Sequence, residues 1–252
     1  MRASRILLPV SGLAILVGAW QIAVAMSPAT LVPSPSQSVR AIGELAEKGL
    51  LLKYIVASLF RVTWGYVAAL IVAVPLGVML GLWRRGEQAL NPLLQLLRPI
   101  SPLAWIPIAI LWFGVGDVAA MFLIFLASLL PLTVTAMHAV HNIDEVHLAA
   151  ARNFGLTTPQ LVRSIVLPAI LPQLVVGMRI TLGIAWLVVV AAEMIAVSSG
   201  LGFLIIDARN AGNRYDLVVA GMILIGAIGV VLDLLMRRLE RLPAVRWGYV
   251  GE

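Results

Sequence analysis

The sequence lacks cysteine and is poor in charged residues. Among 252 residues there is no cysteine, and only 12% are charged. The first absence excludes a disulfide framework, a thiolate metal site and a cysteine nucleophile. Soluble domains carry about 25% charged and about 45–50% apolar residues, whereas 61% of this chain is hydrophobic. A chain this apolar could not cover its surface in water, so the composition predicts a protein embedded in lipid.

Features of an enzyme or a nucleotide-binding protein are also missing. No phosphate-binding loop of the Gly-x-x-x-x-Gly-Lys type occurs, so any use of ATP would need another subunit. His138, His141 and His147 lack an arrangement of carboxylates that would make a metal site. We therefore predict no catalytic residue, no metal ligand and no cofactor in this chain. The net charge of +6 comes from arginines beside apolar runs, which indicates membrane topology rather than a nucleic-acid partner.

Six apolar segments have about the 20 residues that a membrane helix requires. They cover residues 6–26, 55–83, 89–113, 118–137, 169–197 and 217–236. The first is longer than the apolar core of a signal peptide, so we predict a retained span. The third contains four prolines and should be bent. Residues 38–53 are predicted to form an amphipathic helix, residues 84–87 a turn that ends the second span, and residues 207–210 an outer loop.

An even number of spans places both ends of the chain on one side of the membrane. The arginines concentrate near the N-terminus, at residues 84–85, in residues 138–167 and in the C-terminal tail. Because cytoplasmic loops retain Lys and Arg, both termini are predicted to be cytoplasmic. The expected location is the bacterial inner membrane, which the chain would cross several times.

A polar segment between the fourth and fifth spans predicts a helix–glycine–helix unit. Asp144 and Glu145 lie where a helix dipole favours negative charge, and Ala149–Ala151 are strong helix formers. Gly155 is a natural helix stop, so we expect a helix over residues 143–154 and a second over 158–166. The small side chains would let another protein approach closely, although an ordinary interhelical loop is the alternative.

This segment resembles a motif of permease subunits of binding-protein-dependent ABC importers. The family pattern is Glu-Ala-Ala, three residues, Gly, nine residues, Ile-x-Leu-Pro. Here it reads Ala149-Ala150-Ala151, Gly155 and Ile165-Val166-Leu167-Pro168, with the full spacing. Ala149 stands where the pattern often has Glu, and Glu145 is the carboxylate one turn earlier.

Further stretches resemble the nitrate/sulfonate/taurine branch of these permeases, over nearly the whole chain. They are Leu31-Val-Pro-Ser-Pro-Ser36, Ser58-Leu-Phe-Arg61, Arg98-Pro-Ile-Ser-Pro-Leu-Ala-Trp-Ile-Pro107, Leu111-Trp-Phe-Gly-Val-Gly116, Gly177-Met-Arg-Ile180, Trp186, Ala191-Ala-Glu193 and Gly200-Leu-Gly-Phe203. The resemblance implies an all-α integral membrane protein with the type I ABC importer permease fold and a cytoplasmic coupling helix. Residues 1–252 would be one transmembrane domain. Its parts would be a first span with an outer amphipathic segment (1–53), core spans (54–236), a coupling region (142–167) and a cytoplasmic tail (237–252).

The resemblance also implies partners and a mechanism. ABC ATPase subunits, which bind ATP and Mg, would dock on the coupling helix through Glu145, Ala149, Ala150, Ala151, Arg152, Phe154 and Gly155. A second permease copy, or a related permease, would complete the pore, and an external solute-binding protein would deliver a small anion such as a sulfonate, taurine or nitrate. Two other classes stay open on the residues alone: a self-sufficient secondary transporter or channel, and a membrane-embedded enzyme.

Charged residues inside the spans are expensive and are candidates for function. Arg61 and Glu193 have similar predicted depths, so we predict that they interact and help to hold an outer gate. Arg61 or Arg179 could instead set a positive field for an anion, and all of these charges could simply form structural pairs or reach the membrane surface. Trp186 is a further candidate for the translocation path, with packing as the alternative.

Overall fold

Long apolar runs satisfy their backbone groups in lipid by forming helices, and helices dominate this chain. The computed structural model describes residues 4–26, 32–242 and 245. The first half contains α1 (Ser4–Met26), α2 (Pro35–Glu47), α3 (Leu50–Leu82), α4 (Arg84–Leu97), a 3-10 turn η1 (Pro102–Trp105) and α5 (Ile106–Phe113). The second half contains α6 (Asp117–His141), α7 (Glu145–Asn153), α8 (Thr158–Leu161), a π-helical turn η2 (Val162–Val166), α9 (Leu167–Ala196), α10 (Leu201–Asn210) and α11 (Tyr215–Glu240).

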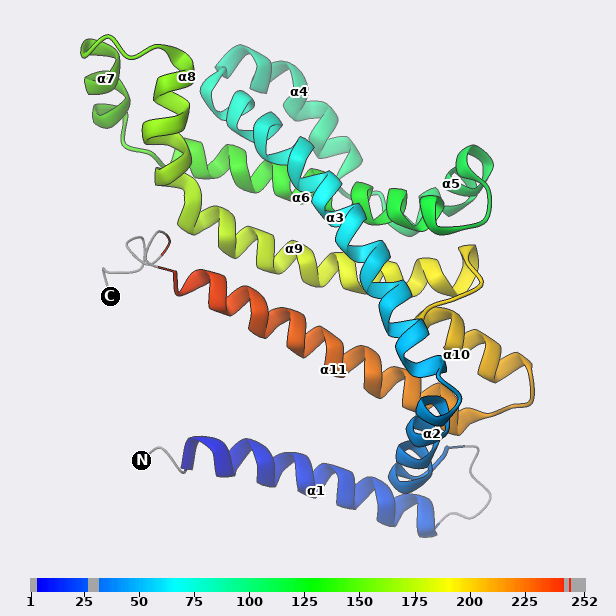
Figure 1. The fold of residues 1–252 in the computed structure, drawn as a ribbon. Coiled ribbons are helices and arrows are strands. Elements are labelled where there is room, and N and C mark those ends of the chain that lie inside the picture. Colours follow the sequence, from blue (N-terminus) through cyan, green and yellow to red (C-terminus); the bar gives the residue numbers. More distant parts are fainter. Residues whose placement is uncertain (1–3, 27–31, 243–244, 246–252) are drawn as a thin grey trace.

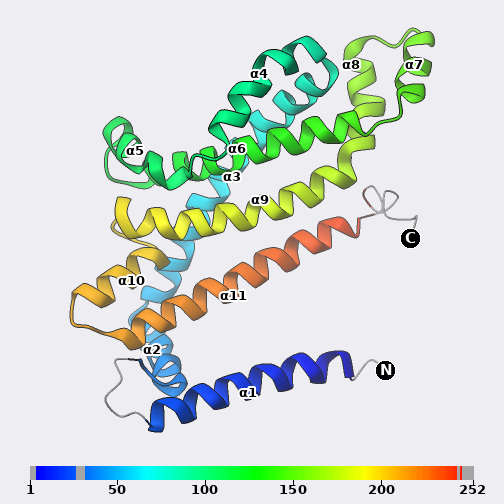
Figure 2. The ribbon, with the colours of Figure 1, turned by 180° about the vertical axis from the view of Figure 1, so that it is seen from behind.

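Helices α6, α9 and α11 lie side by side, and α3 crosses this layer (Figure 1). The view from behind shows the same order, with α3 packed against α6 and α9 (Figure 2). Small residues allow these contacts: a Cβ at Gly65 or Gly77 of α3 would collide with the α6 backbone. Helix α1 lies apart at the edge of the layer, beside α2.

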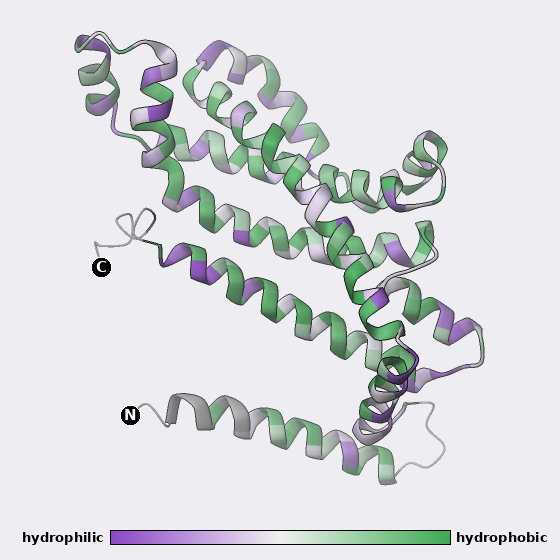
Figure 3. Ribbon diagram, viewed as in Figure 1, coloured by the Kyte–Doolittle hydropathy of each residue, from purple (hydrophilic) through white to green (hydrophobic). Residues whose placement is uncertain are grey.

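The apolar helices of the described chain fit a membrane. Four are long and apolar enough to cross one, namely α3, α6, α11 and the continuous run Thr158–Ala196. A fifth span results if α4 and residues 102–113, which meet at 85°, are counted together. Helix α1 adds the apolar segment Ser11–Met26, so the prediction of about six spans matches the order of the apolar segments and is approximate in number. Figure 3 shows hydrophobic residues along the long helices and hydrophilic ones around α7 and α4.

The two ends of the layer carry different elements. Helix α1 begins, and α11 ends, on the side where α7 and α8 lie (Figure 1). Helices α2 and α10 lie at the opposite end, near the start of α3. We call these the α7 end and the α10 end. The predicted placement of both chain ends on one side therefore agrees with the arrangement of α1 and α11.

Several predicted boundaries were wrong. The amphipathic helix starts at Pro35 and ends at Glu47, because Ser34 and Gln37 form a capping box and Gly49 adopts a φ of +68° before α3. Residues 84–87 are the first turn of α4 rather than a terminating turn. The expected loop at residues 207–210 belongs to α10. The predicted bend of the third span is confirmed, as α4 and residues 102–113 are separate helices.

The second helix of the helix–glycine–helix unit does not end before the fifth span. Residues 158–196 form one continuous helical run in which Pro168 occupies the first turn of α9. The π-helical turn bridges the two parts: the Leu167 N–H donates to the Val162 carbonyl, five residues earlier. Proline has no N–H to offer, and this wider turn accommodates it without breaking the helix.

Candidate functional site

A buried ionic cluster joins the helices at the α10 end. Arg61 of α3 places Nη1 2.6 Å from Glu193 Oε1 of α9, and its Nε donates to Asp117 Oδ1 at 2.8 Å. Its other N–H groups donate to the carbonyl and hydroxyl of Ser199. The side chains of Arg61 and Glu193 are 3% and 0% exposed, whereas that of Asp117 is 54% exposed. The arginine is thus fully engaged, with its ion pair to Glu193 shielded from solvent.

Glu193 lies in a socket shaped by the chain that follows it. Oε2 accepts hydrogen bonds from Ser58 Oγ and from the Gly202 N–H, both at 2.9 Å. Gly200 adopts a φ of +107°, and a Cβ there would collide with the Glu193 carboxylate. Donors from α3 and α10 therefore hold this carboxylate, and they make the cluster a junction of α3, α9 and α10.

A second arginine network joins α9 to α11 nearer the α7 end. Arg179 Nε lies 2.5 Å from Asp233 Oδ1, and Nη1 lies 3.3 Å from Glu240 Oε1. Arg237 also bridges to Asp233, at 2.9 Å. The side chains of Arg179 and Asp233 are 28% and 39% exposed, so solvent shares in this network.

Helix α7 presents an exposed surface beyond the long helices. Asp144 caps it, as its Oδ1 accepts the Val146 N–H at 2.9 Å. Gly155 ends it with a φ of +76°, a backbone conformation that disfavours other residues. Ala151 is buried in a cluster with Leu161 and Val166, whereas the Phe154 side chain is 85% exposed. One alanine thus anchors the helix while an aromatic ring points outward.

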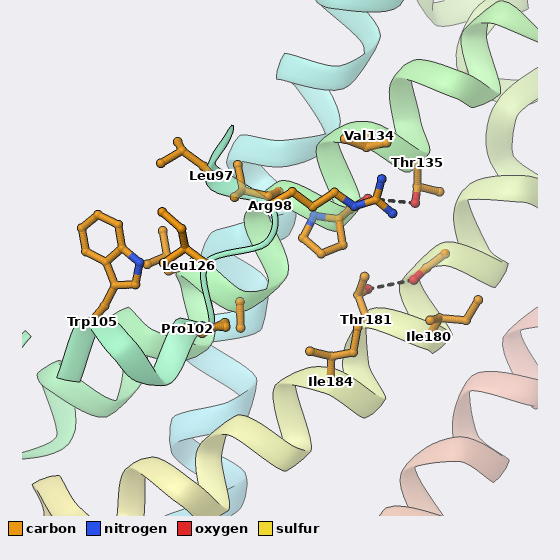
Figure 4. A pocket seen from close by; sticks show the side chains of 15 residues that line it. Leu97, Arg98, Pro102, Trp105, Leu126, Val134, Thr135, Ile180, Thr181 and Ile184 are labelled. Carbon is orange, nitrogen blue, oxygen red and sulfur yellow. Dashed lines mark hydrogen bonds between the residues drawn. The ribbon is translucent and has the colours of Figure 1, made fainter. Parts of the chain in front are cut away.

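A cavity of 490 Å³ opens between the break after α4, helix α6 and helix α9. Its walls come from residues 97–105, from α6 between Leu126 and Thr135, and from α9 between Gly177 and Ile184. Figure 4 shows the guanidinium of Arg98 reaching across this space toward Thr135. Gly177 lets α6 and α9 approach at the cavity, because a Cβ there would strike the Thr135 side chain.

Comparison with known proteins decides the family. Residues 73–244 match the family described as "Binding-protein-dependent transport system inner membrane component". The chain belongs to this family. It is 36% identical to the taurine transport system permease protein TauC of Escherichia coli over 76% of this chain and 72% of that one. It is also 36% identical to the bicarbonate transport system permease protein CmpB of Synechococcus elongatus, over 94% and 88% of the two chains.

A solved structure shares the fold. The structure of the MetNI methionine ABC transporter in inward-facing conformations aligns with a TM-score of 0.68 at 19% identity, over 76% of this chain and 95% of that one. This permease therefore has the type I ABC importer permease fold, and it belongs to the nitrate/sulfonate/taurine branch of importer permeases. It is a non-catalytic, multi-pass subunit of the inner membrane.

The structure brings some predicted site residues together and separates others. Arg61 and Glu193 form the predicted direct contact. Arg179 lies elsewhere, and both arginines are paired with carboxylates. That Arg61 or Arg179 sets a positive field for an anion stays a prediction. Trp186 is 5% exposed and donates to the Ile225 carbonyl of α11 at 3.0 Å, so it packs between α9 and α11, and its place in the translocation path stays a prediction.

Most of the residues predicted to dock an ATPase are exposed, and one is buried. Glu145, Ala149, Ala150, Arg152, Phe154 and Gly155 are exposed. Ala151 is the exception: it is 3% exposed and packs into the permease itself, so it anchors α7 and offers no surface. The Asp117 carboxylate, the Ser58 hydroxyl that donates to Glu193 and the acceptors of Ser199 were missed. Ser58 and Arg61 nevertheless stand one turn apart in a stretch that the sequence analysis singled out.

Proposed function

We propose that this permease forms the translocation path of an ATP-driven importer and changes access when a separate ABC ATPase acts on α7. The observation that carries the proposal is the exposed helix α7, anchored by Ala151 and ended by Gly155, on the side where α1 begins and α11 ends. That side would be cytoplasmic, with both termini there. The ATPase would bind ATP and Mg, and a solute-binding protein would act at the α10 end.

The proposed assembly contains two permease copies, with a related permease as the alternative second subunit. The proposed solute is a small anion such as a sulfonate, taurine, nitrate or a related ion. Two relatives that match similarly well are named for different solutes, taurine and bicarbonate, which favours a path that accepts small oxyanions and leaves the finer choice to the binding protein.

The exposed Phe154 ring, at the end of α7, is a candidate contact for the partner ATPase. Phe154 follows the last residue of α7, and its side chain is 85% exposed, so it packs little against the described residues. Buried in a groove of another protein, an aromatic ring would supply a large apolar contact at little entropic cost. Movement of the ATPase would then pull α7, and α8 with η2 would pass the movement to α9, since residues 158–196 are one helical run.

The decisive variant is Gly155→Asp. It places a side chain in the left-handed conformation at the end of α7 and adds charge beside Phe154. We expect the permease to insert normally, the ATPase to be lost on purification, and uptake to fall by about tenfold or more. Gly49→Asp is the matched control, because Gly49 has a similar φ of +68° but lies next to α2, away from α7.

Native mass spectrometry of the detergent-purified complexes gives the readout. The wild type should show two permease chains with two ATPase chains, and Gly155→Asp should show permease alone. If Gly155→Asp retains the ATPase and transports like the control, α7 is not the docking element. A single permease chain without a related partner would contradict the proposed pair.

A further inference from the structure

Arg61, Arg98 and Arg179 lie within or beside apolar helices, and they differ in what neutralises them. Arg61 is paired with Glu193 and Asp117, and Arg179 with Asp233 and Glu240. The side chain of Arg98 has neither an ion pair nor a hydrogen bond to any residue that the structure describes. The Arg98 side chain is exposed, so its charge is available to a ligand if the residues around it form a site.

Its surroundings supply one. Arg98 lies at the break between α4 and η1, where the chain bends by 85°, and its side chain reaches into the cavity of 490 Å³ (Figure 4). Cavities that bind small molecules typically measure about 300–1,000 Å³. Most of the other lining residues are apolar, among them Trp105, Leu126 and Ile184. Arg98 is thus the one charged residue among the described residues that line this space.

The hydroxyl groups in the cavity cannot replace it. Thr135 Oγ1 already donates to the Pro131 carbonyl at 2.8 Å, and Thr181 Oγ1 donates to the Gly177 carbonyl at 2.8 Å. A hydroxyl has one proton, so both threonines are left with lone pairs that accept. An anion in this cavity can therefore take hydrogen bonds from the Arg98 guanidinium, which carries the only charge in the described lining, and from the indole N–H of Trp105. The threonines can accept from an ammonium or hydroxyl group on the same solute.

We propose that Arg98 is the anion-binding residue of the translocation path and that the cavity between α4, α6 and α9 holds a small oxyanion in transit. This inference rests on the proposed importer function and names the residue through which that path recognises its solute. A guanidinium presents two parallel N–H groups that match two oxygens on one central atom. Sulfonates, nitrate and bicarbonate all present such a pair of oxygens, whereas a neutral solute does not.

Uptake by the assembled complex tests the assignment. Permease, ATPase and binding protein are reconstituted in vesicles, and labelled taurine, bicarbonate and nitrate serve as probes. For a probe that the wild type imports, Arg98→Ala should lower uptake about tenfold or more, since one charge-assisted pair is lost. Stimulation of ATP hydrolysis by the binding protein should persist. Arg85→Ala is the matched control: it removes an exposed arginine from the far end of α4 and should change neither quantity.

Uptake by Arg98→Ala at the wild-type rate would overturn the proposal. If that variant fails to assemble, Arg98→Lys tests the proposal instead, because lysine keeps the charge and lacks the two parallel N–H groups of the guanidinium. A several-fold rise in KM for the anion with kcat maintained supports the proposal, and an unchanged KM overturns it.

Labelling separates this inference from the importer function. The chain has no cysteine, so Ile184→Cys, which places a thiol in the lining of the same cavity and keeps Arg98, offers a single thiol, and the label can be counted by mass on the permease alone. A cationic thiosulfonate reagent should react with this thiol, and millimolar taurine or nitrate should slow the reaction. The rate at which Arg85→Cys is labelled should be the same with and without either anion. Protection without uptake or ATPase stimulation in the wild type would sink the importer function and retain the site. Normal import without any protection would retain the function and sink the site.

Discussion

The arginine clusters at the two ends of the permease use the same chemistry in different surroundings. Arg61 and Arg179 each face two carboxylates from other helices. At the α10 end the Arg61–Glu193 pair is closed off, with side chains 3% and 0% exposed. Nearer the α7 end the Arg179–Asp233 pair is 28% and 39% exposed, and Arg237 competes for the same carboxylate.

Because of this difference we expect the two clusters to have different roles. A buried carboxylate that loses its cation is left uncompensated in an apolar site, so the Arg61–Glu193 pair favours one arrangement of α3, α9 and α10 strongly. A half-exposed pair can exchange partners with water at little cost. Rigid closure at the α10 end and adjustable contacts near α7 are what a path with an outer gate and a moving inner side would need.

The largest expected effect comes from Glu193→Ala. It leaves Arg61 without its buried partner and leaves the donors at Ser58 and Gly202 without an acceptor, so we expect a loss of about 3–5 kcal/mol in stability. The melting temperature of the complex in detergent should fall clearly. If the pair is a gate latch, ATP hydrolysis should also become independent of the binding protein.

Arg61→Ala separates the latch from a role in binding solute. Loss of uptake with intact stimulation by the binding protein would refute the latch. A charge swap would not serve as a control, because the Ser58 and Gly202 donors and the crowding at Gly200 leave no room for a cation at position 193. Glu193→Gln is the better partner variant, as it keeps the shape and removes the charge.

A smaller effect is expected from Arg179→Ala. Solvent already screens this network, so Arg179→Ala should lower the melting temperature by less than about half as much as Glu193→Ala does. The difference from wild type should shrink further in about 0.5 M salt, where the Debye length is only a few ångströms. Arg237→Ala, which touches the same Asp233 from within α11, is the control. A drop as large as that of Glu193→Ala would show that exposure does not distinguish the two clusters.

Sequence patterns were sufficient for the long helices and for the contact between Arg61 and Glu193. Runs such as residues 118–137 are apolar over a full membrane thickness, and equal depth placed the two charges together. Asp117 was missed because it follows the glycine turn just outside the predicted span, where depth gives no guide. Helix α10 was missed because only five hydrophobic residues of this helix precede Asp207, too few for a span, and its packing against α9 and α11 is a tertiary property.

The cavity could not be predicted for a related reason. Its walls come from three segments that are separated along the chain, and the 85° break that turns Arg98 toward them depends on how α4 and residues 102–113 pack. The prolines of that segment predicted a bend, but they did not predict the direction of the bend. The free charge of Arg98 likewise emerged only once the partners of Arg61 and Arg179 were known.

The smallest expected effect concerns a third charge cluster, on the surface at the α10 end. Glu44 of α2 accepts from Arg214, which precedes α11, at 2.7 Å and from Lys48 at 2.5 Å. These donors lower the pKa of Glu44 from 4.5 to about 2, with Arg214 the larger cause. A depressed pKa means that folding favours the ionised carboxylate. The stabilisation is therefore complete above about pH 4.5 and is lost as the pH falls toward about 2.

Glu44→Gln should reveal this dependence. At neutral pH the variant should melt slightly below the wild type, by less than either arginine variant, because the cluster is open to water. The gap between the two melting temperatures should close as the pH falls through the window from 4.5 to about 2, since the wild type then loses the same charge. Glu47→Gln, on the same helix and without an ion pair in the described chain, should show no such gap. A gap that stays constant with pH would mean that residue 44 acts through its shape, and that surface charge does not link α2 to α11.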